Sequence, residues 1–186
     1  MTYARPAVFL DRDGVLVEER GDVTHASQLR LVTTAGFALV VVTNQSAISR
    51  VLVSANFVSE MNAWLGARLA RAGANIEGFY VRPHHPARVV TELRHVCGCR
   101  KPRPGLVVTA SRELCLALDR RSVPVGGQQS DVECALAAGV TPALVRTGKG
   151  VTCEPEARRI VPDLLVAGDL LEVARALMAH PSGMSP

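Results

Sequence analysis

Two short apolar runs, each ending abruptly in polar residues, constrain the fold of this chain more than any other feature. The run at 7–10 (Ala-Val-Phe-Leu) leads into Asp11-Arg12-Asp13-Gly14, and the run at 39–42 (Leu-Val-Val-Val) leads into Thr43-Asn44-Gln45-Ser46. Short apolar runs without alternation are typical of parallel strands that are buried on both faces. The two runs therefore predict a parallel sheet that delivers both polar loops to one edge.

The rest of the chain alternates between strand-like and helix-like segments. Further strands are expected at 78–81, 123–125 and 143–145. Helices are expected at 54–72, 104–118, 131–138 and 170–179. The apolar face of the first of these helices would consist of Phe57, Met61, Trp64, Leu65 and Leu69. This order predicts a doubly wound α/β domain with right-handed crossovers over residues 1–180, followed by a frayed tail at 181–186.

Composition narrows the class of protein further. The 186 residues are 48% hydrophobic and 20% charged, which suits one globular domain and excludes a disordered chain. The longest apolar stretch, at 35–42, is far below the roughly 20 residues of a membrane-spanning helix. Residues 1–6 lack the order of a secretory signal. We expect a cytoplasmic protein that has no membrane partner and is a monomer.

The basic residues point to a small anionic ligand. The net charge is +4, but the positive side chains are spread along the chain, so a nucleic-acid partner is not expected. Only Lys101 and Lys149 supply an ammonium group, because all the other basic residues are arginines. Lys149, in the segment 146–149, is expected on a surface loop.

The carboxylates after the first strand suit phosphoryl transfer. In an open parallel sheet the ligand lies beyond the carboxyl ends of the strands, where Asp11, Asp13 and the loop 43–46 would meet. The first carboxylate can attack phosphorus and hold a cation, while the second passes a proton to the leaving group. The alternative is a solvated turn. Lys101 fits the first interpretation, since a compact ammonium balances carboxylate and phosphoryl charge.

Five ordered motifs carry a resemblance to a known family: Phe9-Leu-Asp-Arg-Asp-Gly-Val15, Gly36-Phe-Ala-Leu-Val-Val-Val-Thr-Asn-Gln-Ser46, Pro83-His-His-Pro86, Cys97-Gly-Cys-Arg-Lys-Pro-Arg-Pro-Gly105 and Leu144-Val-Arg-Thr-Gly-Lys149. With them the chain resembles the haloacid dehalogenase (HAD) superfamily, and within it the D-glycero-D-manno-heptose 1,7-bisphosphate phosphatases, with histidinol-phosphate phosphatases as near relatives. The resemblance implies a HAD-like sheet with helices on both faces and no large cap domain.

The resemblance also implies the activity and the site. Asp11 would form an aspartyl-phosphate and Asp13 would be the acid/base. The phosphate would be bound by Thr43, Asn44, Gln45, Ser46, Arg100 and Lys101. Mg²⁺ would be held by Asp11, the Asp13 carbonyl and Asp131. The substrate would be a small phosphorylated sugar, with the C7 phosphate of heptose bisphosphate as the leading candidate. Histidinol phosphate is an alternative, because residues 18–22 do not match closely.

Three departures from the family leave a non-catalytic phospho-ligand-binding protein as a further alternative. Gly127 stands where the family has a magnesium-binding aspartate, in Gly126-Gly127-Gln128-Gln129-Ser130-Asp131. The crossover between Asp13 and Thr43 is about ten residues shorter, close to the minimum of about a dozen for joining parallel strands. The expected Gly-Ile-Ala-Arg-Gly is altered to Ala-Ile-Ser-Arg-Val at 47–51.

The long segment 82–104 is a candidate zinc-loop insertion. His84, Cys97 and Cys99 are ligand types that Zn²⁺ prefers, and the family carries a structural zinc there. Arg82 stands at the position of the family's fourth ligand. His85, His95 or water could replace that ligand, or the loop is metal-free and the cysteines are ordinary thiols. The other cysteines are expected at different places: Cys115 and Cys134 in the core on helical faces, and Cys153 in a loop.

Overall fold

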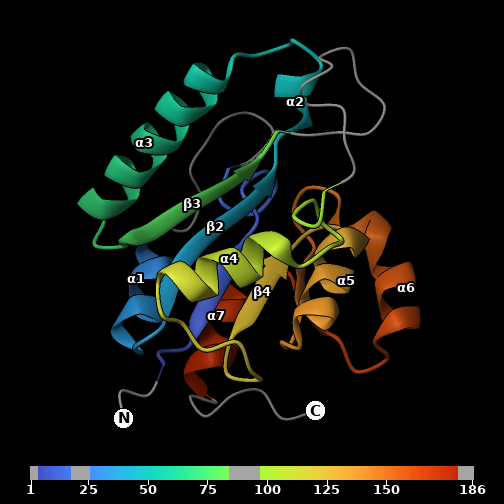
Figure 1. Ribbon diagram of the computed structural model, residues 1–186. Coiled ribbons are helices and arrows are strands. Elements are labelled where there is room, and N and C mark those ends of the chain that lie inside the picture. Colours follow the sequence, from blue (N-terminus) through green and yellow to red (C-terminus); the bar gives the residue numbers. More distant parts are fainter. Residues whose placement is uncertain (1–3, 18–25, 84–96, 180–186) are drawn as a thin grey trace.

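The computed structural model describes residues 4–17, 26–83 and 97–179, and these form a six-stranded parallel sheet between two layers of helices (Figure 1). The strand order is β3-β2-β1-β4-β5-β6. The strands are β1 (Ala7–Leu10), β2 (Ala38–Asn44), β3 (Ile76–Arg82), β4 (Val123–Gly126), β5 (Ala143–Val145) and β6 (Leu165–Ala167). The order runs in opposite directions on either side of β1 and β4, which confirms the doubly wound fold and places its switch point there.

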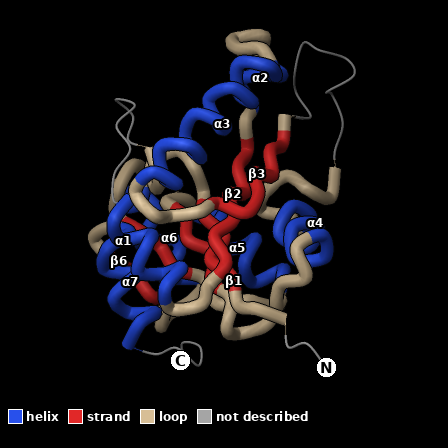
Figure 2. Tube along the Cα trace, turned by 90° about the vertical axis from the view of Figure 1, so that its left-hand side faces the viewer, coloured by secondary structure: helices blue, strands red, loops and turns tan. Residues whose placement is uncertain are grey.

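Helices cover both faces of this sheet. On one face lie α1 (Ala26–Thr34), α3 (Ala55–Arg71) and α7 (Leu170–Ala179). On the other lie α4 (Gly105–Glu113), α5 (Gln129–Ala138) and α6 (Gly150–Ile160). The short α2 (Ser46–Ser49) follows β2 at one end of the sheet, as the view in Figure 2 also shows.

The alternation of side chains along β1 explains why its sequence is apolar throughout. Val8 and Leu10 belong to the core cluster with α1, α3 and α7, whereas Ala7 and Phe9 belong to the cluster with α4. All four side chains are at most 1% exposed. A strand buried on both faces has no position for a polar side chain until it ends, and the polar residues begin at Asp11.

Several elements differ from those expected. The strands at 7–10, 39–42, 78–81, 123–125 and 143–145 and the helix at 170–179 are present, while β6 and α6 were not predicted. The expectation of a helix to residue 118 is wrong. The helix α4 ends at Glu113, because Cys115 has a φ of +52° and Leu116 bridges to Arg5.

The apolar face of α3 is also only partly as expected. Ser54 caps the helix by accepting a hydrogen bond from the Phe57 N–H at 3.0 Å. Leu65 and Leu69 are buried together with Val58 and Asn62. Phe57 and Trp64, however, are about half exposed, at 50% and 47%, and Met61 is 39% exposed. The face of α3 that contacts the core is therefore rotated about the helix axis relative to the predicted face, and the two faces share Leu65 and Leu69.

The short crossover between β1 and β2 is closed by a helix of nine residues, α1. This helix packs against α7 and β2, with Leu29 and Val32 in the core. Residues 18–22, which include the poorly matching loop, lie outside the described residues. The shortened connection is therefore compatible with the parallel pairing of β1 and β2.

Two of the three cysteines expected outside the zinc loop lie elsewhere. Cys134 is 1% exposed in the core, as expected. Cys115 is exposed in the turn after α4 rather than buried on a helical face, and Cys153 lies within α6 rather than in a loop. Among the described helices, none combines the length and the apolar character needed to span a bilayer.

Candidate active site

Asp11 lies at the switch point of the sheet. It directly follows β1, which pairs with β2 on one side and β4 on the other. Its N–H donates to the Val125 carbonyl at 2.9 Å, so its backbone is fixed to β4. Thr43 lies on the adjacent strand β2 and is 1% exposed. The two polar loops that were predicted to meet therefore begin at the carboxyl ends of neighbouring strands.

Lys101 connects the buried carboxylates of this site. Its Nζ lies 2.9 Å from Asp11 Oδ1 and 2.6 Å from Asp131 Oδ1, and it donates to the Val42 carbonyl at 3.0 Å. Asn44 holds the Lys101 backbone from both sides: its amide donates to the Lys101 carbonyl and its Oδ1 accepts from the Lys101 N–H, each at 3.2 Å. Both the backbone and the ammonium group of Lys101 are thus fixed in position.

The ion pairs decide the charge of this cluster. Asp11, Lys101 and Asp131 are each 5–6% exposed. Burial alone would lower the pKa of Lys101, but Asp11 and Asp131 outweigh it and raise that pKa well above its ordinary value of 10.5. Burial raises the pKa of Asp131, although Lys101 opposes this effect. Lys101 therefore carries a permanent positive charge beside Asp11.

Asp131 is held by the first turn of α5. Its Oδ2 accepts from the Gln128 N–H at 3.0 Å, which is half of a capping box. Gly126 makes room for it, since a Cβ on Gly126 would lie 2.2 Å from the Asp131 carboxylate carbon. Both oxygens of Asp131 are thus engaged, one by Lys101 and one by the helix cap. Sequence reasoning missed the link between Asp131 and Lys101.

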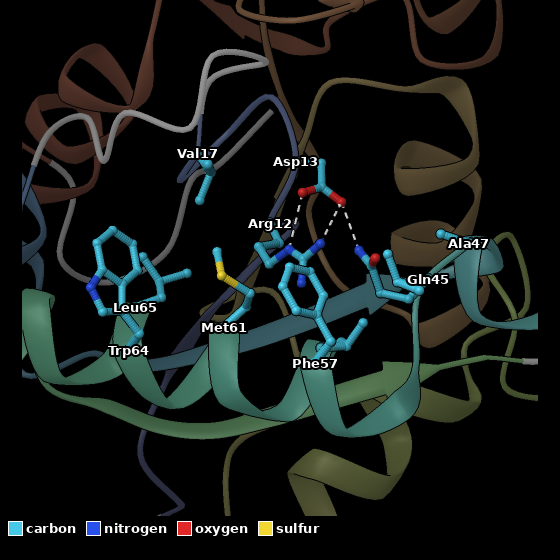
Figure 3. Close-up of a pocket in the computed structure, with 11 residues that line it drawn as sticks. Arg12, Asp13, Val17, Gln45, Ala47, Phe57, Met61, Trp64 and Leu65 are labelled. Atoms are coloured by element: carbon cyan, nitrogen blue, oxygen red, sulfur yellow. Dashed lines mark hydrogen bonds and ion pairs between the residues drawn. The ribbon is translucent and has the colours of Figure 1, made fainter. Parts of the chain in front are cut away.

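Asp13 differs from Asp11 because its side chain is 58% exposed, and Figure 3 shows it beside Arg12 and Gln45. Arg12 pairs with both of its oxygens, at 3.0 and 3.2 Å, and Gln45 donates to Oδ2 at 2.6 Å. Gln45 also donates to Thr43 Oγ1 at 3.1 Å, so it connects Asp13 to β2. Asp13 is therefore an oriented carboxylate in contact with solvent.

Two contacts that the sequence did not reveal position the Asp13 loop. Arg12 donates through Nη1 to Asn62 Oδ1 on α3, at 3.2 Å. Thr147 donates through Oγ1 to the Gly14 carbonyl at 2.5 Å. The only available signal for the first contact was a polar residue, Asn62, in the middle of an apolar helix face. Gly14 has a φ of +81° and would crowd the loop of Thr147 if it carried a side chain.

A pocket of about 220 Å³ lies between the Asp13 loop and α3 (Figure 3). Arg12, Asp13 and Gln45 line one end of it. The exposed side chains of α3, Phe57, Met61 and Trp64, line much of the rest. The half-exposed α3 residues therefore form a wall of this pocket.

The remaining predicted residues differ in how far they are buried. Ser46 is half-buried at the first position of α2, and Arg100 is half-buried directly before Lys101. Lys149 is exposed immediately before α6, as expected of a surface residue.

The site offers fewer oxygen ligands for a magnesium ion than the three that the resemblance implies. Asp11 and the Asp13 carbonyl are available in principle, whereas Asp131 is engaged by Lys101 and Gln128. Gly127 offers no side chain. Within the described ranges, no three His, Cys, Asp or Glu side chains are placed to share an ion. Mg²⁺ commonly uses one or two carboxylates, several waters and a substrate phosphate, so Asp11 with the Asp13 carbonyl fits this pattern.

The residues described around the candidate zinc loop do not fit a zinc ion. Arg82 Nε donates to Cys97 Sγ at 2.7 Å, so a cationic side chain already occupies this sulfur. Burial raises the pKa of Cys97, but hydrogen bonds from Cys99 and Arg82 outweigh this and lower it. His84, His85 and His95 lie outside the described residues. Arg82 thus places a positive charge beside the sulfur atom that a zinc ion would bind.

The arrangement suits the binding and attack of a phosphoryl group. A carboxylate at the end of a strand lies beside a fixed ammonium, and a second, solvent-exposed carboxylate is held two residues later. The ammonium can neutralise the oxygens of a bound phosphate, and the exposed carboxylate can exchange a proton with solvent.

Comparison with known proteins agrees with this chemistry. Residues 98–173 match the family model described as HAD-hydrolase-like. The D-glycero-beta-D-manno-heptose-1,7-bisphosphate 7-phosphatase of Yersinia pestis is 39% identical over 84% of this chain and 89% of its own. The enzyme of the same name from Escherichia coli strain K12 is 39% identical over 84% of this chain and 87% of its own.

A solved structure shows the same likeness. The D,D-heptose 1,7-bisphosphate phosphatase of B. bronchiseptica, in complex with magnesium and phosphate, superposes with a TM-score of 0.80 at 27% identity. The superposition covers 94% of this chain and 98% of the other.

Proposed function

This chain belongs to the D-glycero-β-D-manno-heptose 1,7-bisphosphate 7-phosphatase family of HAD-like hydrolases, and we propose that it removes the C7 phosphate of that sugar through a covalent intermediate on Asp11. The contact between Lys101 Nζ and Asp11 Oδ1, at 2.9 Å, carries this proposal. A buried carboxylate next to a fixed cation is what a nucleophile that attacks a phosphate dianion requires.

In the proposed reaction, an Asp11 carboxylate oxygen attacks phosphorus and forms an aspartyl-phosphate, while the bond from phosphorus to the sugar oxygen breaks. Asp13 donates a proton to the departing sugar oxygen. It then takes a proton from a water molecule that attacks the aspartyl-phosphate, which releases inorganic phosphate and restores Asp11. The exposure of Asp13 supports this role, since its proton must exchange with solvent.

The other residues of the site bind or position these groups. Thr43, Ser46 and Arg100 are proposed to bind the phosphate oxygens. Asn44 is proposed to act mainly through the Lys101 loop, because its amide is already bonded to the Lys101 backbone on both sides. Gln45 would orient Asp13 through the bond of 2.6 Å to its Oδ2.

Magnesium is proposed to bind Asp11 and the Asp13 carbonyl and, when bound, to supply additional positive charge to the phosphate. The magnesium in the related B. bronchiseptica structure supports this part of the proposal. Asp131 is assigned a positioning role instead, because both of its oxygens are engaged.

A second candidate function rests on Gly127. Without a carboxylate at this position, the chain could bind a phosphorylated ligand without hydrolysing it, since cation binding is weakened. The buried pair of Asp11 and Lys101 favours the enzyme, because binding alone does not need a nucleophile.

The decisive experiment measures phosphate release, in the presence of magnesium, from heptose 1,7-bisphosphate, histidinol phosphate and other sugar phosphates. Asp11→Asn serves as the background, because it keeps the shape of the side chain and removes the nucleophile. We expect turnover to be highest with the heptose and absent in the variant. A preference for histidinol phosphate would change the substrate, and binding without turnover in the wild type would establish the second candidate.

A further inference from the structure

Two thiols and a guanidinium group meet at the carboxyl end of β3, and none of the three has a part in the proposed phosphatase reaction. Cys97 Sγ accepts a hydrogen bond from Arg82 Nε, the last residue of β3, at 2.7 Å. It also accepts hydrogen bonds from the backbone N–H and the thiol of Cys99. A sulfur atom that faces these donors and a cation is stabilised as the thiolate, which is the nucleophilic form of cysteine.

The surroundings of the two thiols differ. Both are partly buried. Cys99 packs against the apolar cluster that contains Leu106 and Val107 of α4, whereas Cys97 contacts the guanidinium of Arg82. Cys97 is therefore suited to react first with a small oxidant, and Cys99 is held beside it as a second thiol.

The backbone of this short segment is attached to the start of α4. Arg103 Nη1 donates to the Cys97 carbonyl at 3.3 Å, and the Gly105 N–H donates to the Gly98 carbonyl at 3.0 Å. Two Cα atoms separated by one residue are at most about 7 Å apart, and a disulfide usually joins Cα atoms that are about 4–7 Å apart. A disulfide can therefore close between Cys97 and Cys99, and the small ring that it forms favours easy reduction.

We propose that Cys97 and Cys99 form a reversible dithiol site that hydrogen peroxide oxidises to a disulfide. The Cys97 thiolate attacks one peroxide oxygen, the O–O bond breaks, and the products are a sulfenic acid on Cys97 and hydroxide, which takes a proton from water. The Cys99 sulfur then attacks the Cys97 sulfur. The S–S bond forms as the S–O bond breaks, and the departing hydroxide leaves as water with the Cys99 proton. The two thiols lose two electrons and one peroxide molecule gains them.

The first test follows this disulfide in the purified chain, with a chelator present so that no metal ion covers the thiols. Both cysteines fall in one tryptic peptide, residues 95–100. After brief treatment with hydrogen peroxide and alkylation of the remaining thiols, we expect this peptide to carry no alkyl group and to weigh two hydrogen atoms less than its reduced form. Dithiothreitol should restore both thiols.

Cys115 is the internal control for this measurement. It is exposed, whereas Cys97 and Cys99 are only partly so, and it falls in a separate tryptic peptide, residues 113–120. If exposure alone decided the reaction, Cys115 would be oxidised first. We expect it to stay fully alkylated at a peroxide dose that closes the disulfide. Oxidation of Cys115 before Cys97, or oxidation of Cys97 without a bond to Cys99, would overturn the proposal.

The second test assigns the two roles. In Cys99→Ser, peroxide should leave Cys97 as a sulfenic acid, which dimedone labels. In Cys97→Ser, Cys99 should remain an unlabelled thiol at the same dose. The opposite labelling, or equal labelling of the two variants, would contradict the assignment of Cys97 as the reacting sulfur.

The third test measures how fast iodoacetamide alkylates Cys97 at neutral pH. Arg82→Gln removes the charge beside the sulfur and should slow the reaction about threefold, because the loss of thiolate is partly offset by the higher nucleophilicity of the thiolate that remains. Arg103→Gln is the matched control, since Arg103 donates to the Cys97 carbonyl, and it should leave the rate unchanged. Equal rates in the wild type and in Arg82→Gln would show that the guanidinium does not activate Cys97 and would overturn the proposal. None of these measurements depends on phosphatase activity.

Discussion

Lys101 Nζ lies 2.6 Å from Asp131 Oδ1, closer than its 2.9 Å contact with the proposed nucleophile Asp11. Asp131 is itself fixed by the first turn of α5, through the Gln128 N–H. The position of the ammonium therefore depends on the cap of the helix that follows β4. This geometry makes α5 part of the machinery that prepares Asp11, through the side chain of Asp131.

Replacing the cation should abolish activity and weaken the fold. Lys101→Met leaves the carboxylates of Asp11 and Asp131 buried without a counter-charge, which costs about 3–5 kcal/mol in comparable buried pairs. We expect phosphate release to fall to background and the urea midpoint to drop. Lys149→Met is the matched control, since Lys149 is the other lysine and is exposed. A Lys101→Met protein that kept its activity would contradict the role given to this ammonium.

Supplying the missing carboxylate should strengthen magnesium binding. Gly127 has an ordinary φ, and a Cβ there would lie 3.3 Å from the Thr147 carbonyl, with its next neighbour at 3.8 Å. Gly127→Asp is thus expected to fold and to lower the magnesium concentration at half-maximal activity several-fold, because a charged oxygen replaces a water ligand. The measurement is a titration of phosphate release against magnesium.

Gly127→Ala separates the two effects of that substitution, because it adds the same Cβ without the carboxylate. It should leave the half-maximal magnesium concentration unchanged. If Gly127→Asp behaved like Gly127→Ala, the position would lie too far from the ion to contribute a ligand.

Glu154 should make the stability of the protein depend on acid pH. Its carboxylate accepts hydrogen bonds from Arg146 at 2.7 and 2.9 Å and from Arg158 at 3.0 Å, and these lower its pKa to about 2 from an ordinary value of 4.5. A lowered pKa contributes stability above pH 4.5 that is lost as the pH falls toward 2. Glu154→Gln removes this contribution, so the difference in unfolding midpoint from the wild type should shrink over that range.

The neighbouring Glu156→Gln is the control for this measurement. Glu156 pairs only with Arg159 on the exposed side of α6, among the interactions described. We expect its substitution to change the midpoint little at any pH. A difference between Glu154→Gln and the wild type that stayed constant from pH 5 to pH 2.5 would show that the loss is not one of charge.

The sequence predicted the strands around the site well because burial on both faces leaves an unmistakable pattern. The short apolar runs at 7–10 and 39–42 are typical of strands that are buried on both faces, and they place Asp11 and Thr43 at the carboxyl ends of two neighbouring strands. Lys101 was recognised because lysine is scarce in this chain. These signals are local in sequence, and the structure confirms the elements that they predicted.

Other parts of the structure depend on contacts between distant residues and could not be predicted in the same way. The ion pair of Lys101 with Asp131 depends on where the turn after β4 places the first turn of α5. β6 has only three residues, of which Leu165 and Val166 are partly exposed, so it lacks the complete burial of the equally short β5. The exposed face of α3 resembled a core face because a pocket lined by Phe57, Met61 and Trp64 has the same apolar spacing as a core. Hydrophobic periodicity shows which residues share a face, but not what covers that face.

Arginine at position 82 should keep the Cys97 loop from holding a full equivalent of zinc. Its guanidinium donates to Cys97 Sγ at 2.7 Å and thus competes with a cation for the same sulfur. We expect less than one zinc per chain in the purified protein by elemental analysis. Arg82→Cys removes this charge and adds a thiolate to the set of His84, Cys97 and Cys99, which would complete a closed tetrahedral site.

We therefore expect Arg82→Cys to bind one zinc per chain and to unfold several degrees higher, because metal binding to the folded state stabilises it. A chelator should remove this gain. Arg82→Ser is the control, since serine has the size of cysteine but supplies no thiolate, and it should neither bind zinc fully nor gain stability. A full equivalent of zinc in the unmodified protein would contradict the assignment, because His85 or His95 would then have to supply the fourth ligand despite the guanidinium at Cys97.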